Sequence, residues 1–307
     1  MIETVGLGRK FQSTVAVEDL SLQIKDGEAF AFLGPNGAGK TTTVRMLCCL
    51  IAPTSGTAYL NSLDVRDKKA QLQIRQNIGL LPENPGLYES LGAYRNLDFF
   101  ARLYGVGAQD REKRIMDLLK TLNLWDRRDE AVGKFSKGMK QKVAIARALV
   151  HNPDYIFLDE PTAALDPEAA KTVREFLLDL KKEGRTIFLN THNLDEAQRV
   201  CDRIGVLRTH LLAVGAPDEL ASRYFGRATL IQLREVRPEH LQAVTSMPNV
   251  LDVRQENSSL IVDVADPKRD NPAIVSKLVS LGADIAYVED VKRSLEEIYL
   301  KLIGGGR

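Results

Sequence analysis

The sequence predicts an α/β fold class: a parallel-sheet core with an all-helical insert, followed by a small C-terminal α+β domain. Three short apolar segments, at 28–34, 155–160 and 186–190, are typical of buried strands, because each ends at glycine or polar residues. Longer helical patterns such as 167–184 lie between them, and this alternation favours a parallel sheet with helices on both faces. Ligands of such sheets bind at the carboxyl ends of the strands, which is where functional residues are expected.

Residues 88–133 interrupt the alternation and predict the helical insert. Two sets of residues in this segment recur at helical spacing, and no strand pattern falls among them. The sets are Tyr94, Leu97, Ala101 and Tyr104, followed by Ile115, Leu118, Leu119 and Leu122.

The pattern changes again after about residue 226. Alternating strand-like segments occur at 228–233, 250–255, 259–264 and 283–288. Helical segments fall between the first two and the last two, so the order is β-α-β-β-α-β, that of a ferredoxin-like unit. The two-residue "NS" between the middle strands fits a tight hairpin, and "SLEEIYLKLI" closes the chain as a helix. We therefore expect two domains, residues 1–226 and 227–307.

Composition excludes several classes of protein. A formal net charge of +1 gives no general attraction to nucleic acid or acidic lipid, so no nucleic-acid partner is expected. The three cysteines, Cys48, Cys49 and Cys201, have no zinc-type spacing and favour a reduced, cytosolic chain in which they are small buried side chains. The N-terminus lacks a signal-peptide pattern, and the apolar segments are shorter than the ~20 residues that span a bilayer.

A glycine-rich segment, "GPNGAGKTT", follows the first apolar strand and precedes a helical pattern. It matches G-x-x-x-x-G-K-[ST], in which backbone amides surround phosphate oxygens at the start of a helix. Lys40 then places a positive charge on the outer phosphates, and Thr41 offers a hydroxyl to Mg²⁺. The alternative is a simple turn between a strand and a helix. The predicted phosphate loop comprises Gly34, Pro35, Asn36, Gly37, Ala38, Gly39, Lys40, Thr41 and Thr42.

Two acids end the strand at 155–160. Asp159, near a phosphate loop, is suited to hold Mg²⁺ directly or through water, and Glu160 is suited to orient and deprotonate an attacking water. The alternative is a strand-end carboxylate that caps the next turn. Asp166 precedes Pro167 at the start of a helical segment, and helix capping alone would explain it.

These motifs, in this order, resemble the nucleotide-binding subunit of ABC (ATP-binding cassette) transporters over residues 1–226. The resemblance is carried by Phe11, "GPNGAGKTT", "LLPEN", "FSKGMKQK", "YIFLDEP", "ALD" and "THN". It implies a P-loop NTPase core that binds ATP and Mg²⁺.

The resemblance implies a role for three further residues. Phe11 occupies the position of an aromatic side chain that stacks on adenine, although a core aromatic is the alternative. Glu83 stands where the family usually has a glutamine that contacts Mg²⁺ and water, and an exposed loop acid is the alternative. His192 matches the histidine that contacts the terminal phosphate, and a structural histidine is the alternative.

The segment "FSKGMKQK" resembles the family's signature loop, which binds the γ-phosphate of ATP held by a second cassette. Its residues are Ser136, Lys137, Gly138 and Met139, with lysine and methionine in place of the usual glycine and glutamine. Lys137 either points into solvent or faces the γ-phosphate across a dimer. Asp166 falls in the family's D-loop. The resemblance therefore implies a head-to-tail dimer, with a second copy or with a paralogue.

The resemblance also implies a membrane permease as the partner, to which the helical insert docks. The C-terminal part resembles the accessory domain of exporter-type cassettes, where it supports dimers, regulates the enzyme or simply packs. The implied function is an ATP-hydrolysing motor subunit, cytoplasmic and peripheral on the inner face of the cell membrane, that drives export. The alternatives are a soluble ABC ATPase of translation or DNA repair, and a cassette that binds ATP without hydrolysing it.

Overall fold

The computed structural model describes residues 1–84, 86–163, 165–225, 227–264, 266–291 and 294–304. It divides into two compact units, Met1–Ala216 and Pro217–Arg307. The division lies before the boundary predicted after residue 226, because the helix at 217–225 packs against the last helix of the chain.

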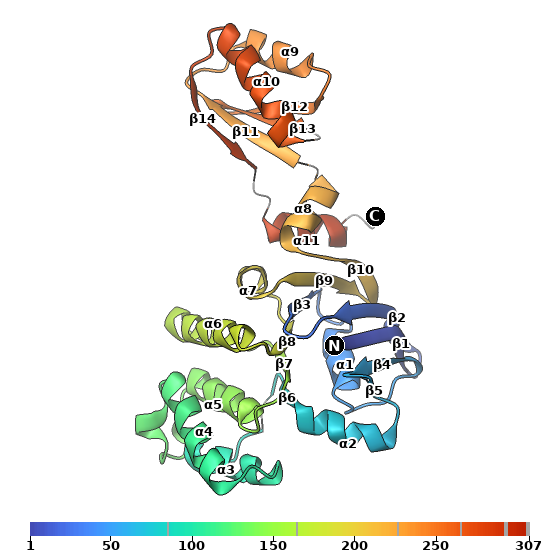
Figure 1. The fold of residues 1–307 in the computed structure, drawn as a ribbon, viewed down its shortest axis with the longest axis vertical. Coiled ribbons are helices and arrows are strands. Elements are labelled where there is room, and N and C mark those ends of the chain that lie inside the picture. Colours follow the sequence, from blue (N-terminus) through green and yellow to red (C-terminus); the bar gives the residue numbers. More distant parts are fainter. Residues whose placement is uncertain (85, 164, 226, 265, 292–293, 305–307) are drawn as a thin grey trace. The chain divides into compact units, whose positions relative to one another are not determined.

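The first unit is built on a six-stranded sheet of order β10-β9-β3-β8-β7-β6 (Figure 1). Strand β10 is antiparallel to β9, and the other neighbours are parallel, as the sequence predicts for its core. The three apolar segments form β3, β7 and β8, in which every residue is buried. The strands are β3 (Ala29–Leu33), β6 (Ile78–Leu81), β7 (Tyr155–Asp159), β8 (Thr186–Asn190), β9 (Arg203–Arg208) and β10 (His210–Gly215).

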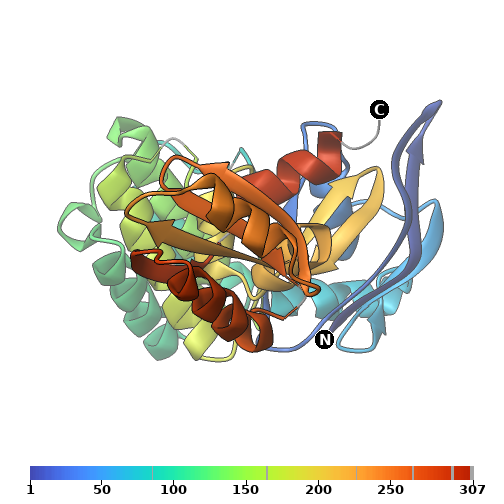
Figure 2. The same ribbon diagram turned by 90° about the horizontal axis from the view of Figure 1, so that it is seen from above.

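A second sheet, which the sequence pattern did not indicate, lies against one face of the first. Its order is β2-β1-β4-β5, all antiparallel, and β1 and β2 form a long hairpin (Figure 2, dark blue). Side chains along β1 and β2 alternate irregularly between buried and exposed, since three bulges shift their pairing. The strands are β1 (Ile2–Phe11), β2 (Thr14–Ile24), β4 (Ser55–Leu60) and β5 (Leu63–Asp64).

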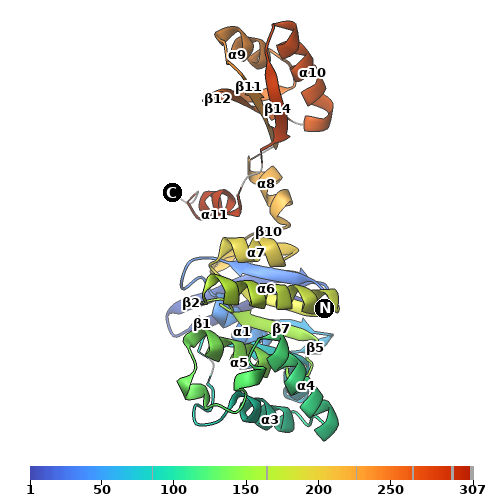
Figure 3. The ribbon, with the colours of Figure 1, turned by 90° about the vertical axis from the view of Figure 1, so that its left-hand side faces the viewer.

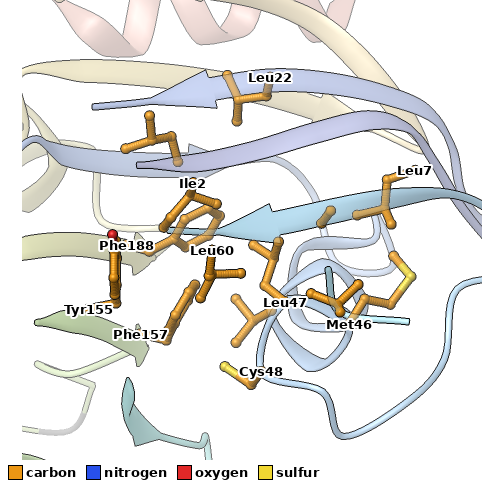
Figure 4. Packing of buried hydrophobic residues seen from close by; sticks show 14 of the residues in the cluster. Ile2, Leu7, Leu22, Met46, Leu47, Cys48, Leu60, Tyr155, Phe157 and Phe188 are labelled. Atoms are coloured by element: carbon orange, nitrogen blue, oxygen red, sulfur yellow. The ribbon is translucent and has the colours of Figure 1, made fainter. Parts of the chain in front are cut away.

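The hydrophobic core fills the space between the two sheets and helix α1 (Lys40–Leu47). Ile2, Leu7 and Leu60 from the antiparallel sheet face Met46 and Phe157 (Figure 4). Aromatic rings of the parallel strands pack against one another, and Phe32 and Phe188 do so edge to face with their centroids 5.1 Å apart. This packing fixes the strand ends that carry the motifs.

Helices cover both faces of the parallel sheet. Helices α5, α6 and α7 lie on one side of it, and α1 and α2 lie on the side of the antiparallel sheet (Figure 1). The helical insert predicted at 88–133 contains α3 and α4, which pack beside α5 (Figure 3). The helices are α1 (Lys40–Leu47), α2 (Lys68–Asn77), α3 (Ala93–Leu103), α4 (Ala108–Thr121), α5 (Lys137–Leu149), α6 (Pro167–Lys182) and α7 (Leu194–Val200), with 3₁₀ turns at Trp125–Arg127 and Val132–Lys134.

The second unit has the predicted order β-α-β-β-α-β, flanked by α8 and α11. Its antiparallel sheet has the order β12-β13-β11-β14, and the predicted hairpin turns at Asn257 and Ser258. Its core, which includes Ile231, Val262 and Leu278, packs the helices onto one face of the sheet. The elements are α8 (Pro217–Phe225), β11 (Arg227–Leu233), α9 (Pro238–Thr245), β12 (Val250–Glu256), β13 (Ser259–Val264), α10 (Pro267–Ser280), β14 (Ile285–Asp290) and α11 (Leu295–Gly304).

Candidate active site

The predicted phosphate loop, residues 34–42, connects β3 to the N-terminus of α1. Gly39 has a φ of 99°, and a Cβ atom there would lie 2.3 Å from the backbone oxygen of Ala16 in β2. A Cβ atom at Gly34 would lie 2.3 Å from the backbone oxygen of Leu207 in β9. Glycine is therefore needed at both positions, because the backbone of a neighbouring strand lies against the loop at each of them.

Lys40 wraps its side chain around the loop. Its Nζ donates hydrogen bonds to the backbone oxygens of Gly34 at 2.6 Å and Pro35 at 3.1 Å. Partial burial lowers the pKa of Lys40, whereas the charges of Glu160 and Asp159 raise it. The ammonium group thus contacts the loop and feels the charges of the two acids, and an anionic ligand would add to its stabilisation.

Thr41, Glu83 and Asp159 line one cavity of about 130 Å³. The Thr41 hydroxyl donates to Oδ2 of Asp159 at 2.9 Å. Burial raises the pKa of Asp159, the hydrogen bond from Thr41 lowers it, and the charges of Glu160 and Glu83 raise it. One hydroxyl and two carboxylates are hard oxygen ligands that fit Mg²⁺, which usually completes its octahedron with water and substrate phosphates.

Glu160 is the residue that follows β7, and its backbone is in the left-handed region with a φ of 51°. The backbone N of Glu160 donates to the backbone oxygen of Asn190 at 2.8 Å, which fixes the turn to the end of β8. Its carboxylate accepts from the backbone N of His192 at 3.0 Å, from His192 Nδ1 at 2.8 Å and from the Thr191 hydroxyl at 3.3 Å. The structure therefore joins the two predicted residues, Glu160 and His192, by a direct contact.

Two residues of this network were not predicted from the sequence. Gln141 in α5 donates its side-chain amide to the backbone oxygens of Glu160 at 3.3 Å and Pro161 at 3.2 Å. Thr191 is fully buried and contacts Glu160 through its hydroxyl. The sequence signals are a polar residue inside the signature-like segment and a residue next to His192, and neither indicates what the side chain contacts.

The signature-like segment forms the N-terminus of α5. The Ser136 hydroxyl accepts from the backbone N of Met139 at 3.2 Å and so caps the helix. Lys137 is exposed, and a Cβ atom at Gly138 would lie 3.2 Å from the Leu165 side chain. Within the described residues, these contacts involve α5 and Leu165 but not the phosphate loop.

Phe11 and Asp166 have clear local environments. Phe11 is the last residue of β1, its side chain is 42% exposed, and the Arg9 guanidinium lies 4.5 Å from its ring centroid. It is thus not a core aromatic. Asp166 caps α6, because its Oδ1 accepts from the backbone N of Ala169 at 2.8 Å. The cysteines are free, as expected: Cys48 and Cys201 are buried, and Cys49 is half-buried.

Comparison with known proteins places this chain in a family. Residues 17–163 match the family described as "ABC transporter". The bacitracin transport ATP-binding protein BcrA of Bacillus licheniformis is 34% identical over 309 residues, covering 100% of this chain and 98% of the relative. The linearmycin resistance ATP-binding protein LnrL of Bacillus subtilis is 29% identical and covers 99% of this chain and 98% of the relative.

Solved structures agree with this result. The ATP-binding subunit of an ABC transporter is 32% identical, has a TM-score of 0.68 and covers 74% of this chain and 94% of its own. The cassette MJ0796, in a dimeric post-hydrolysis state bound to ADP and Pi, is 28% identical with a TM-score of 0.65, and covers 70% and 98%. In the part of the chain that the structure describes, no helix has the length and apolarity to span a membrane. The chain therefore belongs to the ABC transporter family, as an ATP-binding subunit with ATPase activity.

Proposed function

We propose that this chain is the motor subunit of an ABC exporter, in which Glu160 is the base for ATP hydrolysis. The observation that carries this proposal is the arrangement around Glu160. The charge of Glu160 acts on Lys40 of the phosphate loop, raising its pKa, and His192 donates to the Glu160 carboxylate at 2.8 Å. A carboxylate held in this way is suited to accept the proton of water as that water attacks the γ-phosphorus.

The phosphate loop, residues 34–42, binds the phosphates through its amides and Lys40, and Phe11 stacks on the adenine. Mg²⁺, held by Thr41 and Asp159 with Glu83 nearby, supplies positive charge that stabilises the transferring phosphoryl group. Glu83 adds a negative charge where the family usually has a neutral glutamine, and it raises the pKa of Asp159 through its charge. His192 contacts the terminal phosphate with the edge of its ring that Glu160 does not occupy.

The second half of each ATP site comes from another cassette. The N-terminus of α5, with Ser136, Lys137, Gly138 and Met139, binds the γ-phosphate of the ATP on the partner, and Asp166 lies in the same interface. The dimeric state of the similar cassette MJ0796 supports this arrangement, and the positive end of the α5 dipole suits a phosphate. The partner is a second copy or a paralogous cassette.

A membrane permease is the third component. An aromatic cluster at the start of the helical insert contains Tyr88 and Phe99, which are 45% and 40% exposed and whose ring centroids are 5.1 Å apart. Leu103 and Tyr104 on the same insert are also exposed. Exposed apolar clusters of this kind mark protein interfaces, so this surface docks the permease and places the subunit on the cytoplasmic face of the membrane.

Export is favoured by relatives that match nearly the whole chain, including residues 217–307. Their names state linearmycin resistance and bacitracin transport. We assign residues 217–307 as the C-terminal accessory domain of this exporter-type branch.

The test of the catalytic assignment is phosphate release by the purified chain with Mg²⁺ and ATP. We expect Glu160→Gln to lower kcat by about 100-fold or more and to leave ATP binding intact, because only the proton acceptor is removed. Glu168→Gln, an exposed acid in the first turn of α6, is the matched control and should retain wild-type turnover. Wild-type turnover by Glu160→Gln would contradict the assignment of the base.

A further inference from the structure

Thr191 lies between two carboxyl groups. Its Oγ1 is 3.3 Å from Oε2 of Glu160 and 3.1 Å from Oε2 of Glu196, and it also accepts from the backbone N of Asn193 at 3.0 Å. A threonine hydroxyl has a single hydrogen, so it can donate to only one of the two carboxyl groups. The other contact is a hydrogen bond only if that carboxyl group carries a proton.

Glu196 is not used as a helix cap. It is the third residue of α7, and "NLDE" spells a capping box in which Glu196 would accept from the amide of Asn193. The side-chain oxygen of Asn193 does accept from the backbone N of Glu196 at 3.1 Å. The backbone N of Asn193, however, donates to the Thr191 hydroxyl and not to Glu196. The carboxyl group of Glu196, which is fully buried, points to Thr191 and the active site.

The surroundings of Glu196 favour its neutral form. Burial raises its pKa, hydrogen bonding to Thr162 and Thr191 lowers it, and the charge of Glu160 raises it further, whereas Arg174 lowers it. Although Thr162 is close, no partner of normal hydrogen-bond geometry reaches Oε1 of Glu196 among the described residues. A buried carboxylate with an unpartnered oxygen is costly, and protonation relieves most of that cost.

We propose that Glu196, in its protonated form, is a positioning residue that orients Glu160 through Thr191. The inference rests on the proposed role of Glu160 as the base. The acid proton of Glu196 is donated to Oγ1 of Thr191, so the only hydrogen of Thr191 is directed to Oε2 of Glu160. His192 holds the other oxygen, Oε1, and the carboxylate is then fixed at both oxygens.

Ionisation of Glu196 reverses this arrangement. The new carboxylate accepts the hydrogen of Thr191, so Glu160 loses a hydrogen bond and gains a like charge nearby. The active form is protonated, and activity therefore falls as the pH rises through the pKa of Glu196. An amide in its place cannot ionise and donates to Thr191 at every pH.

The other ionisable groups around Glu196 come from the elements packed against it. Strand β3, which packs against α7, has no ionisable side chain, α6 contributes the charge of Arg174, and His192 before α7 contacts Glu160 at 2.8 Å in both the wild type and the variant. Burial raises the pKa of Cys201, at the end of α7, far above neutral. On the helix itself, Asp195 pairs with Arg199 at 2.8 Å and is exposed.

The first test compares kcat for ATP hydrolysis by the wild type and by Glu196→Gln from about pH 5.5 to about pH 9. We expect the ratio of the variant to the wild type to rise about tenfold with pH, the value of one charge-assisted hydrogen bond. Asp195→Asn, on the same helix, is the control and should give a constant ratio. A constant ratio for Glu196→Gln would overturn the proposal.

The second test removes the connection. Thr191→Val keeps the volume but not the hydroxyl, and we expect kcat to fall about tenfold while KM for ATP changes less than about twofold. When Glu196→Gln is added to Thr191→Val, the ratio of its kcat to that of the single variant should rise much less with pH, because only the like charge of Glu196 remains. A rise as large as in the wild-type background would show that Glu196 does not act through Thr191.

Two measurements distinguish a folding defect from a loss of function, and a failure of the proposed base from a failure of the proposal for Glu196. The fluorescence of Trp125, the single tryptophan of the chain, reports urea unfolding of the first unit in each variant. If Glu160→Gln retained wild-type turnover, the proposed function would fail at its base. If Glu160→Gln were inactive and the pH ratio constant, only the assignment of Glu196 would fail.

Discussion

Two glycines of the phosphate loop provide a matched test of why this loop is built as it is. Gly37 and Gly39 both have left-handed backbones, with φ of 81° and 99°. A Cβ atom at Gly39 would lie 2.3 Å from the backbone oxygen of Ala16 and 2.9 Å from Cγ2 of Val17, whereas a Cβ atom at Gly37 would meet nothing within 4 Å. Alanine at the two positions therefore differs mainly in its overlap with β2.

The expected losses of stability follow from two contributions, the left-handed backbone and the overlap with β2. A left-handed alanine costs about 1–2 kcal/mol at either position. The overlap at Gly39 adds about 1–3 kcal/mol, because the contact is with backbone and β2 must move. Gly39→Ala should thus lower the free energy of unfolding by about 2–5 kcal/mol and Gly37→Ala by about 1–2 kcal/mol.

The assay is urea unfolding without nucleotide, followed by the fluorescence of Trp125, which lies in the first unit. The midpoint should fall further for Gly39→Ala than for Gly37→Ala, while the slope with denaturant stays constant. Equal midpoints for the two variants would refute the argument that contact with β2, rather than backbone conformation alone, requires glycine at position 39.

Three further predictions concern the cap, the acid and the ring. Asp166→Ala should lower the free energy of unfolding by about 1 kcal/mol, and Asp166→Asn should restore most of it, because an amide oxygen still caps α6; urea unfolding measures both. Burial raises the pKa of Asp159, so its ionisation destabilises the folded chain in the absence of nucleotide. Asp159→Asn should therefore raise the urea midpoint near pH 7. This gain should shrink as the pH falls, because Asp159 of the wild type is then protonated. Phe11→Ala should raise KM for ATP about 3- to 10-fold, because stacking on the adenine is lost, and Phe11→Tyr should behave as the wild type. An unchanged KM for Phe11→Ala would exclude Phe11 from the adenine site.

The parallel core was predictable because its strands are buried on both faces. Strands β3, β7 and β8 are continuous apolar segments, and such segments stand out in a sequence. The antiparallel sheet left no comparable signal. In β1, Ile2 and Leu7 are buried but Val5 is exposed, since bulges change which side chains face the core.

The second unit shows the same distinction on a smaller scale. Its element order and the turn at Asn257 and Ser258 were predicted from alternating segments and a turn sequence. The place of α8 was not, because its apolar residues, such as Leu220, do not specify which partner they pack against.

By itself the sequence predicted the chemistry of this protein. The loop at 34–42 and the acids Asp159 and Glu160 were predicted because phosphate binding and hydrolysis restrict residue types at fixed spacings, and His192 was predicted through the family resemblance. Only the tertiary structure decided how these groups are held. Glu160 depends on Gln141 and Thr191, and Thr191 depends on Glu196, through hydrogen bonds between β7, β8, α5 and α7. Such contacts are set by how the sheet and helices pack, and spacing along the chain does not encode them.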